Sequence, residues 1–257
     1  MTRARFVAAG AALIAALLAA RGAHAQLALS DEPLPEYGYR HYHSPKGYLV
    51  QVSFGPYRPN IDSEFKSGRT PYNDYFGPDR HLMSQFEFDY EIFQRMGSVS
   101  IGLGAGYFRV SGTAPVANHS ATPSGDKSEV TVIPVSLSAV YRFDHYLVTD
   151  DFPLVPHAKL GLDWDYWSMT DGNGEIALDS AGNQARGGTF GWHAVLGLAL
   201  VIDKLDPDAA KQFDVEMGVN HSALVFEYGH YDVSGLFQSD RLHVGDTTWT
   251  LGLLFEF

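Results

Sequence analysis

The chain has 257 residues, of which 18 are Lys or Arg and 30 are Asp or Glu, so its formal net charge is −12, and it contains no cysteine. The missing cysteines exclude disulfides, thiolate catalysis and Cys-based zinc sites. The acidic excess argues against nucleic acid as a partner, because neutralising phosphates requires Lys and Arg. Nothing in the composition calls for a cofactor.

The first 25 residues are typical of a secretory signal peptide. Arg3 and Arg5 precede an apolar stretch over residues 6–20, and residues 23–25 (AHA) fit the small-x-small cleavage rule. The apolar stretch is shorter than the roughly 20 residues that a membrane-spanning helix needs. We therefore expect a signal peptide over residues 1–25, with an uncleaved anchor as the alternative, an N-terminal periplasmic or interfacial segment over 26–46, and a barrel domain over 47–257.

Eight later segments alternate between apolar and other residues with the period of two that is typical of β-strands. Their ranges are 47–56, 82–94, 98–110, 129–143, 155–169, 189–203, 212–228 and 247–257. Most have the roughly 9 to 15 residues with which a tilted strand crosses a membrane. No long helical periodicity follows the signal peptide.

The connections between these segments alternate in length. Long polar connections over 57–81, 111–128, 170–188 and 229–245 alternate with shorter ones, as in outer-membrane barrels. One shorter connection, residues 205–211, predicts a single helical turn with Asp206 as N-cap and Pro207 at the first helical position.

Alternation alone does not distinguish a membrane barrel from a lipocalin-like soluble barrel, whose apolar face points inward. Opposite its apolar residues, segment 98–110 carries the small residues Ser98, Ser100, Gly102, Gly104 and Gly106. Such small residues suit a narrow barrel interior, and the aromatic residues near the strand ends suit a membrane interface. We therefore predict an all-β, eight-stranded antiparallel up-and-down outer-membrane β-barrel.

The last strand presents one continuous apolar face, formed by Trp249, Leu251, Leu253, Phe255 and Phe257. It resembles the C-terminal assembly signal of bacterial outer-membrane barrels, which implies recognition by the barrel-assembly machinery. With an even number of strands we expect both termini on the periplasmic side and the long loops outside a Gram-negative cell.

Four short segments resemble a family of small outer-membrane β-barrel proteins found chiefly in myxobacteria and their relatives. They are residues 52–59 (VSFGPYRP), 104–108 (GAGYF), 219–222 (VNHS) and 245–249 (GDTTW). The resemblance implies the fold and the location, but the family has no established activity to carry over.

The predicted interior is rich in acids and poor in bases. Its inward positions include Glu87, Asp89, Glu91, Asp163, Asp165, Asp214 and Glu216, with Asp246 and Glu256 on the last strand, against Arg142, Lys159 and His193. Crowded carboxylates bind protons or cations, which suggests a narrow cation-selective pore. The alternative, which we favour, is a salt-bridge network that fills the barrel, since eight strands leave room for little more than side chains.

Other motifs argue only weakly for chemistry. His221 and Ser222, with Glu227 nearby, suggest a lipid A-modifying hydrolase, but adjacent strand residues point to opposite faces. Residues 171–175 (DGNGE) resemble half of a calcium loop that lacks its other ligands. His41 and His43 could share a metal, although a mobile interfacial segment fits them better. We predict no metal site.

The sequence thus predicts a non-enzymatic barrel with a structural or surface-interaction role, set in outer-membrane lipid and lipopolysaccharide. A cation-selective pore is the alternative, and a lipid A-modifying enzyme is a remote third. A ligand and the oligomeric state are left open.

Overall fold

The computed structural model describes residues 47–65, 68–116, 119–150, 152–178, 182–236 and 241–257. The predicted signal peptide and the 26–46 segment, with His41 and His43, lie outside these ranges. Within them, no helix is long and apolar enough to cross a membrane.

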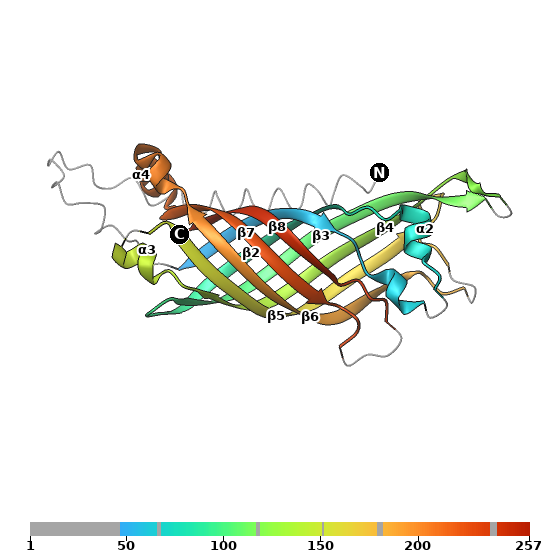
Figure 1. Ribbon diagram of the computed structural model, residues 1–257, viewed down its shortest axis with the longest axis horizontal. Helices are drawn as coiled ribbons and strands as arrows, with labels where there is room; N and C mark the ends of the chain where they lie inside the picture. The colour runs from blue at the N-terminus through green and yellow to red at the C-terminus, as the bar shows by residue number, and fades with distance from the viewer. Residues whose placement is uncertain (1–46, 66–67, 117–118, 151, 179–181, 237–240) are drawn as a thin grey trace. The chain divides into compact units, whose positions relative to one another are not determined.

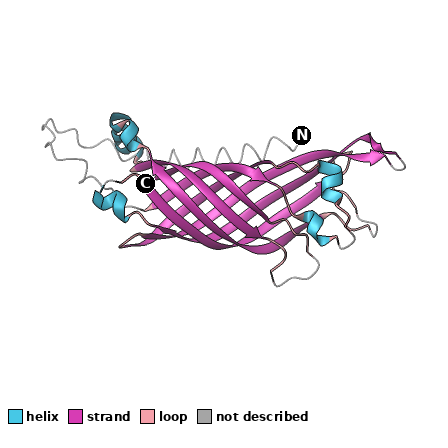
Figure 2. Ribbon diagram, in the orientation of Figure 1, coloured by secondary structure: helices cyan, strands magenta, loops and turns pink. Residues whose placement is uncertain are grey.

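Eight strands form a closed antiparallel barrel in which each strand pairs with its neighbours in sequence and β1 pairs with β8 (Figures 1 and 2). The strands are β1 (Tyr48–Tyr57), β2 (His81–Gln94), β3 (Ser98–Val116), β4 (His119–Arg142), β5 (Leu154–Thr170), β6 (Arg186–Val201), β7 (His221–Asp232) and β8 (Asp246–Glu256). This confirms the predicted eight-stranded up-and-down topology.

The two ends of the barrel differ, and we name them by their connections. The turn end carries the C-terminus and the β2–β3, β4–β5 and β6–β7 connections, the last two containing α3 (His145–Asp150), η2 (Asp203–Leu205) and α4 (Pro207–Met217). The loop end carries the other four connections, and its β1–β2 connection contains η1 (Ile61–Glu64) and α2 (Pro71–Phe76).

One predicted loop, residues 111–128, is largely strand. Gly112 pairs with Ser128 and Thr113 with Lys127, so β3 and β4 continue as a hairpin beyond the other strands (Figure 1). Alternation missed this hairpin because a ribbon outside the membrane needs no apolar face.

The predicted seventh strand, 212–228, is wrong over its first half, because α4 occupies it. The Asp206 carboxylate caps this helix by accepting a hydrogen bond from the Ala209 N–H at 3.1 Å, and Gly218, at φ 70°, ends it in the left-handed conformation. The prediction of a single turn at 205–211 found the start of the helix but not its length. Asp214 and Glu216 consequently lie on α4 rather than in the barrel interior.

The outer wall of the barrel is apolar and exposed. Leu103, Leu160 and Leu196 point outward and are 58%, 62% and 70% exposed. Water would not favour such a continuous apolar surface, whereas the hydrocarbon of a membrane does. The lipocalin-like alternative, with its apolar face inward, is therefore excluded.

The interior is polar at mid-height, and glycines make room for its larger side chains. A Cβ atom on Gly102 would lie 2.5 Å from Asp89 Oδ1, and one on Gly161 would lie 2.5 Å from Cε1 of His193. Gly102, one of the small residues predicted to face inward, is thus needed there because the Asp89 carboxylate approaches closely.

Candidate functional site in the barrel interior

An apolar cluster fills the interior at the loop end. Its buried members are Tyr57, Ile61, Tyr72, Met83, Phe108, Val110, Val130 and Val132, with Phe76, Trp167, Met169 and Leu242 packed against them. Ile61 comes from η1 and Tyr72 from α2, so the β1–β2 connection folds over the mouth of the barrel. We call this cluster the loop-end plug.

Polar contacts hold the β1–β2 connection in this position. The Asp62 carboxylate accepts hydrogen bonds from the backbone N–H groups of Tyr72 at 2.7 Å and Asn73 at 3.2 Å, and it pairs with Arg58 at 3.2 Å. The Arg58 guanidinium lies 5.7 Å from the centre of the Tyr72 ring. Burial raises the pKa of the Tyr72 phenol to about 12, although the nearby Arg58 charge lowers it. The phenol therefore stays neutral, as its apolar surroundings require.

A second apolar cluster lies in the interior at the turn end, on the side formed by β1 and β5–β8. It consists of Leu49, Val155, Ala199, Val201, Ala223, Val225 and Leu254, and Leu147 of α3 packs against it. We call it the turn-end plug. Apolar side chains inside a barrel oppose the passage of water and ions.

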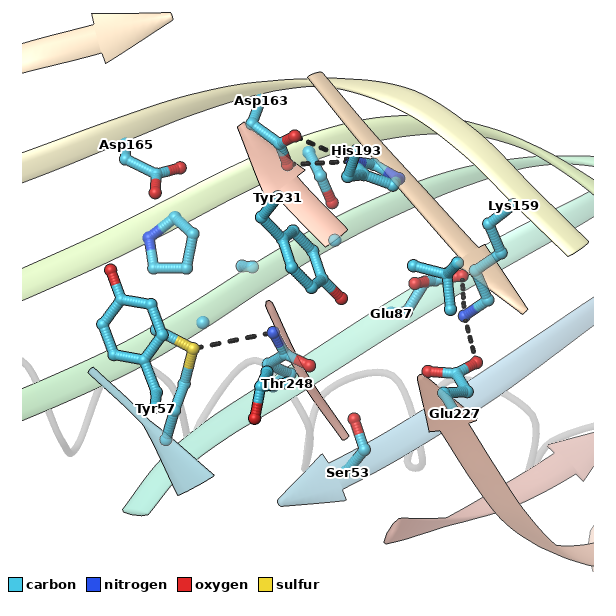
Figure 3. A pocket seen from close by; sticks show the side chains of 18 of the residues that line it. Ser53, Tyr57, Glu87, Lys159, Asp163, Asp165, His193, Glu227, Tyr231 and Thr248 are labelled. Carbon is cyan, nitrogen blue, oxygen red and sulfur yellow. Dashed lines mark hydrogen bonds and ion pairs between the residues drawn. The ribbon is translucent and has the colours of Figure 1, made fainter. Parts of the chain in front are cut away.

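Between the two plugs lies a layer of buried charges centred on Lys159. Its ammonium lies 2.7 Å from Glu87 and 2.8 Å from Glu227, so one cation contacts two carboxylates (Figure 3). His157 lies 2.9 Å from the same Glu227 oxygen. Three strands, β2, β5 and β7, contribute to this cluster, which therefore ties distant parts of the barrel wall together.

A second group in the same layer is Ser138, His193 and Asp163. His193 lies 3.0 Å from the Ser138 hydroxyl through Nε2 and 2.8 Å from the Asp163 carboxylate through Nδ1. This order of contacts is that of a serine hydrolase triad. All three side chains are buried, however, and the adjoining cavity of about 60 Å³ has room for a few water molecules but not for an acyl substrate.

The structure brings most of the predicted interior residues together. Glu87, Asp89, Arg142, Lys159, Asp163, Asp165 and His193 all point inward and are buried or half-buried, and Glu91 lies half-buried towards the turn end. Asp214 and Glu216 are the exceptions, as described above.

Sequence reasoning missed three members of this layer: Ser138, His157 and Glu227. His157 has the same parity as Lys159 on β5, and Ser138 the same as Arg142 on β4, so alternation could have placed both inside. Glu227 was assigned only to the hydrolase motif. Because the predicted seventh strand started too early, its alternation placed Glu227 on the outer face, whereas Glu227 points inward together with Ala223 and Val225.

The other candidate motifs have structural explanations. His221 Nδ1 lies 2.6 Å from Asp203, whose other oxygen accepts the Ser222 N–H at 2.9 Å, so both residues attach β7 to η2. Asp171 accepts hydrogen bonds from the N–H groups of Asn173 and Glu175, which is a loop turn. Across the described part of the chain, no three His, Asp or Glu side chains are arranged to hold a metal ion.

The apolar face of the last strand lies on the outer wall. Trp249, Leu251 and Leu253 are exposed there, and the Phe257 ring stacks on Tyr48 of β1 with ring centres 4.9 Å apart. The Phe257 N–H donates to the Tyr48 carbonyl at 2.9 Å. The end of the chain therefore takes part in closing the barrel.

No protein-family model matches the chain, and no curated protein is similar to it in sequence. Solved structures similar to it include Neisserial surface protein A (TM-score 0.45, 10% identity, 83% of this chain and 98% of that one). OprG from Pseudomonas aeruginosa has a TM-score of 0.44 and 11% identity over 84% of this chain and 97% of its own. Ail of Yersinia pestis, in complex with the heparin analogue sucrose octasulfate, has a TM-score of 0.39 and 9% identity over 82% of this chain and 97% of its own.

The closed ring of strands, the apolar outer wall and the polar interior define the class of the protein. It is an eight-stranded outer-membrane β-barrel.

Proposed function

We propose that the protein is a sealed, non-enzymatic outer-membrane barrel that acts through its loop end, in a structural or surface-interaction role. One observation carries this proposal: apolar plugs lie in the interior at both ends of the charged layer. Conduction requires a continuous aqueous path, and the two plugs oppose one. A narrow cation-selective pore, the alternative from the sequence, therefore has less support.

The same geometry gives little support to an enzyme. Ser138 and His193 are in contact but buried beside a cavity too small for a lipid chain, and His221 and Ser222 each contact Asp203 instead of each other. Expression of a lipid A-modifying enzyme would change the mass of lipid A in the host cell. We expect an unchanged lipid A mass spectrum.

The proposal includes an orientation and partners. The termini face the periplasm, the loop end faces outward into lipopolysaccharide, and the face formed by Trp249, Leu251, Leu253, Phe255 and Phe257 is read by the barrel-assembly machinery. Membership of the narrower family of small barrels found chiefly in myxobacteria belongs to this proposal too.

The orientation has a direct test, because the chain contains no cysteine. Asn173→Cys places a thiol in an exposed loop of the loop end, and Met96→Cys places one in the β2–β3 turn, where Met96 is 67% exposed. A membrane-impermeant maleimide added to intact cells is expected to label the first variant and not the second. Labelling of Met96→Cys but not of Asn173→Cys would show that the barrel has the opposite orientation. Labelling of both after cell lysis is the control for accessibility.

The surface role is tested by shortening the β3–β4 hairpin. Replacing residues 113–127 by a two-residue Asn-Gly turn removes the part of the hairpin beyond the other strands and keeps the barrel. We expect cells carrying the full chain to adhere to surfaces or aggregate and cells carrying the shortened chain to lose this behaviour, while heat-modifiable gel migration stays normal. Unchanged adhesion would remove the hairpin from the proposal.

A further inference from the structure

Asp165 is a buried interior carboxylate that no cation contacts within the described residues. It lies on β5 with its side chain directed into the interior cavity, it is 4% exposed, and its carboxylate forms no hydrogen bond or ion pair within the described residues. Figure 3 shows Asp165 beside the cavity and away from Lys159 and Glu227. A buried carboxylate without a partner is costly and calls for an explanation.

The cross-strand neighbours of Asp165 have no free hydrogen-bond donor for its carboxylate. In the strand register, its neighbours are Pro134 on β4, which has neither an N–H nor a polar side chain, and Thr189 on β6. The Thr189 hydroxyl donates to the Leu242 carbonyl at 3.0 Å and accepts from Trp167 Nε1 at 3.2 Å.

The nearby hydrogen-bond donors on other strands already have other acceptors. The Tyr57 hydroxyl donates to the Val244 carbonyl, and His193 contacts Asp163 rather than Asp165. Lys159 contacts two carboxylates already. No cation among the described residues contacts Asp165, and Asp163, two residues earlier on the same face, adds a second carboxylate to the cavity lining.

The polar side chains that line the cavity in front of Asp165 are mostly oxygen donors, and they lie among apolar ones such as Val195 and Val244. Besides Asp163 and Asp165, the lining includes the hydroxyls of Ser53, Ser136, Tyr231 and Thr248 and the amide of Gln85, whose nitrogen lies 3.6 Å from the Met83 sulfur. Lys159 and its two partners Glu87 and Glu227 also line the cavity, and their charges contact one another. Its volume of about 60 Å³ holds an ion with a few waters. Hard cations prefer such oxygen ligands, and incomplete protein ligation is completed by water.

We propose that this cavity binds one hard metal cation, of the alkali or alkaline-earth class, with the Asp165 carboxylate as its charged ligand. The cation supplies the charge that no side chain supplies, and the hydroxyl and amide oxygens of the lining complete its shell with water. This inference goes beyond the proposed surface role, and either can fail without the other.

The test compares the unfolding of the refolded mature chain in phospholipid vesicles with Na⁺, K⁺ or Ca²⁺ at constant ionic strength, using tetramethylammonium chloride as the background. A ligand present at 100 times its dissociation constant raises the ratio of folded to unfolded protein about 100-fold. We expect one of these cations to raise the urea midpoint in a saturable way. Asp165→Asn is expected to abolish the increase, and Asp208→Asn, an exposed control on α4, to retain it.

A direct measurement decides the question even where a variant does not assemble. The folded wild-type protein, dialysed against a cation and then washed briefly in tetramethylammonium buffer, is expected to retain one metal ion per chain by elemental analysis. No retained metal together with equal midpoints in all salts would overturn the proposal, and would leave a proton as the neutralising species. A midpoint increase that persists in Asp165→Asn would also overturn it.

Discussion

The two halves of the charged layer differ in whether their buried carboxylates have a cationic partner. Around Lys159, Glu87 and Glu227 share one ammonium at 2.7 and 2.8 Å, so a side chain of the protein supplies the cation for both carboxylates. Around Asp165, the cross-strand neighbours are Pro134 and Thr189, and neither has a free donor. The first arrangement stabilises the barrel, whereas the second is free to bind something else.

This contrast separates structural charges from a candidate binding site within one narrow interior. A paired buried charge is strongly needed, because removing one partner leaves the other uncompensated. An unpaired one is dispensable for folding, because replacing it by a neutral group of equal shape removes a cost. The two halves should therefore respond to substitution with opposite signs.

The largest effect is expected at Lys159. Lys159→Met leaves Glu87 and Glu227 buried without a cation and should lower the free energy of unfolding by about 3–5 kcal/mol. Urea titration in vesicles, followed by tryptophan fluorescence, measures this change. The triple variant Glu87→Gln, Lys159→Met, Glu227→Gln is the matched control and should recover most of the loss. Equal stability of the single variant and wild type would refute the structural role of the cluster.

Two carboxylates on the same face of β5 give the sharpest comparison. Asp163→Asn weakens the contact with His193 and should cost about 1–3 kcal/mol. Asp165→Asn, two residues away, breaks no contact and should leave stability unchanged or raised in metal-free buffer. The same urea titration compares them, and a larger loss for Asp165→Asn than for Asp163→Asn would contradict the contrast.

Close packing around the Lys159 cluster is tested by one added methyl group. A Cβ atom on Gly197 would collide with the His157 ring, so Gly197→Ala should cost about 1–3 kcal/mol. Ala139→Val adds carbon on the exposed outer wall and should change stability by less than about 0.5 kcal/mol. Similar losses for both variants would mean that the interior is no tighter than the lipid-facing side.

The smallest effects are expected on α4. Asp214→Asn and Glu216→Gln lie outside the barrel and should each change the free energy of unfolding by less than about 0.5 kcal/mol. A loss of unfolding free energy comparable to that of Asp163→Asn would mean that these two carboxylates belong to the interior network after all.

The barrel wall could be predicted from sequence because the alternation of a membrane strand is visible within a short stretch of the chain. A membrane strand must alternate over about ten residues, and segments such as 155–169 and 189–203 show that alternation almost to their ends. The prediction failed where lipid imposes no pattern, at the β3–β4 hairpin beyond the barrel. It failed also at α4, where Phe213, Val215 and Met217 imitate a strand within a helix that Asp206 and Gly218 delimit.

The interior was harder to predict, because its contacts join strands far apart in sequence. Parity indicates that Lys159 and Asp165 both point inward, but pairing depends on register and barrel stagger. Only the assembled ring places Glu87 and Glu227 at Lys159 and sets Pro134 beside Asp165. The two apolar plugs include Tyr72 and Leu147 from connecting helices, which no alternation rule describes.

The central claim, that both ends of the interior are sealed, is tested most directly by single-channel recording of the refolded mature protein in a planar bilayer. Heat-modifiable gel migration shows that the barrel is folded. The two plugs predict a silent bilayer across the physiological voltage range. Discrete, cation-selective current steps that disappear in Glu87→Gln with Asp89→Asn would contradict the sealed interior and establish the pore.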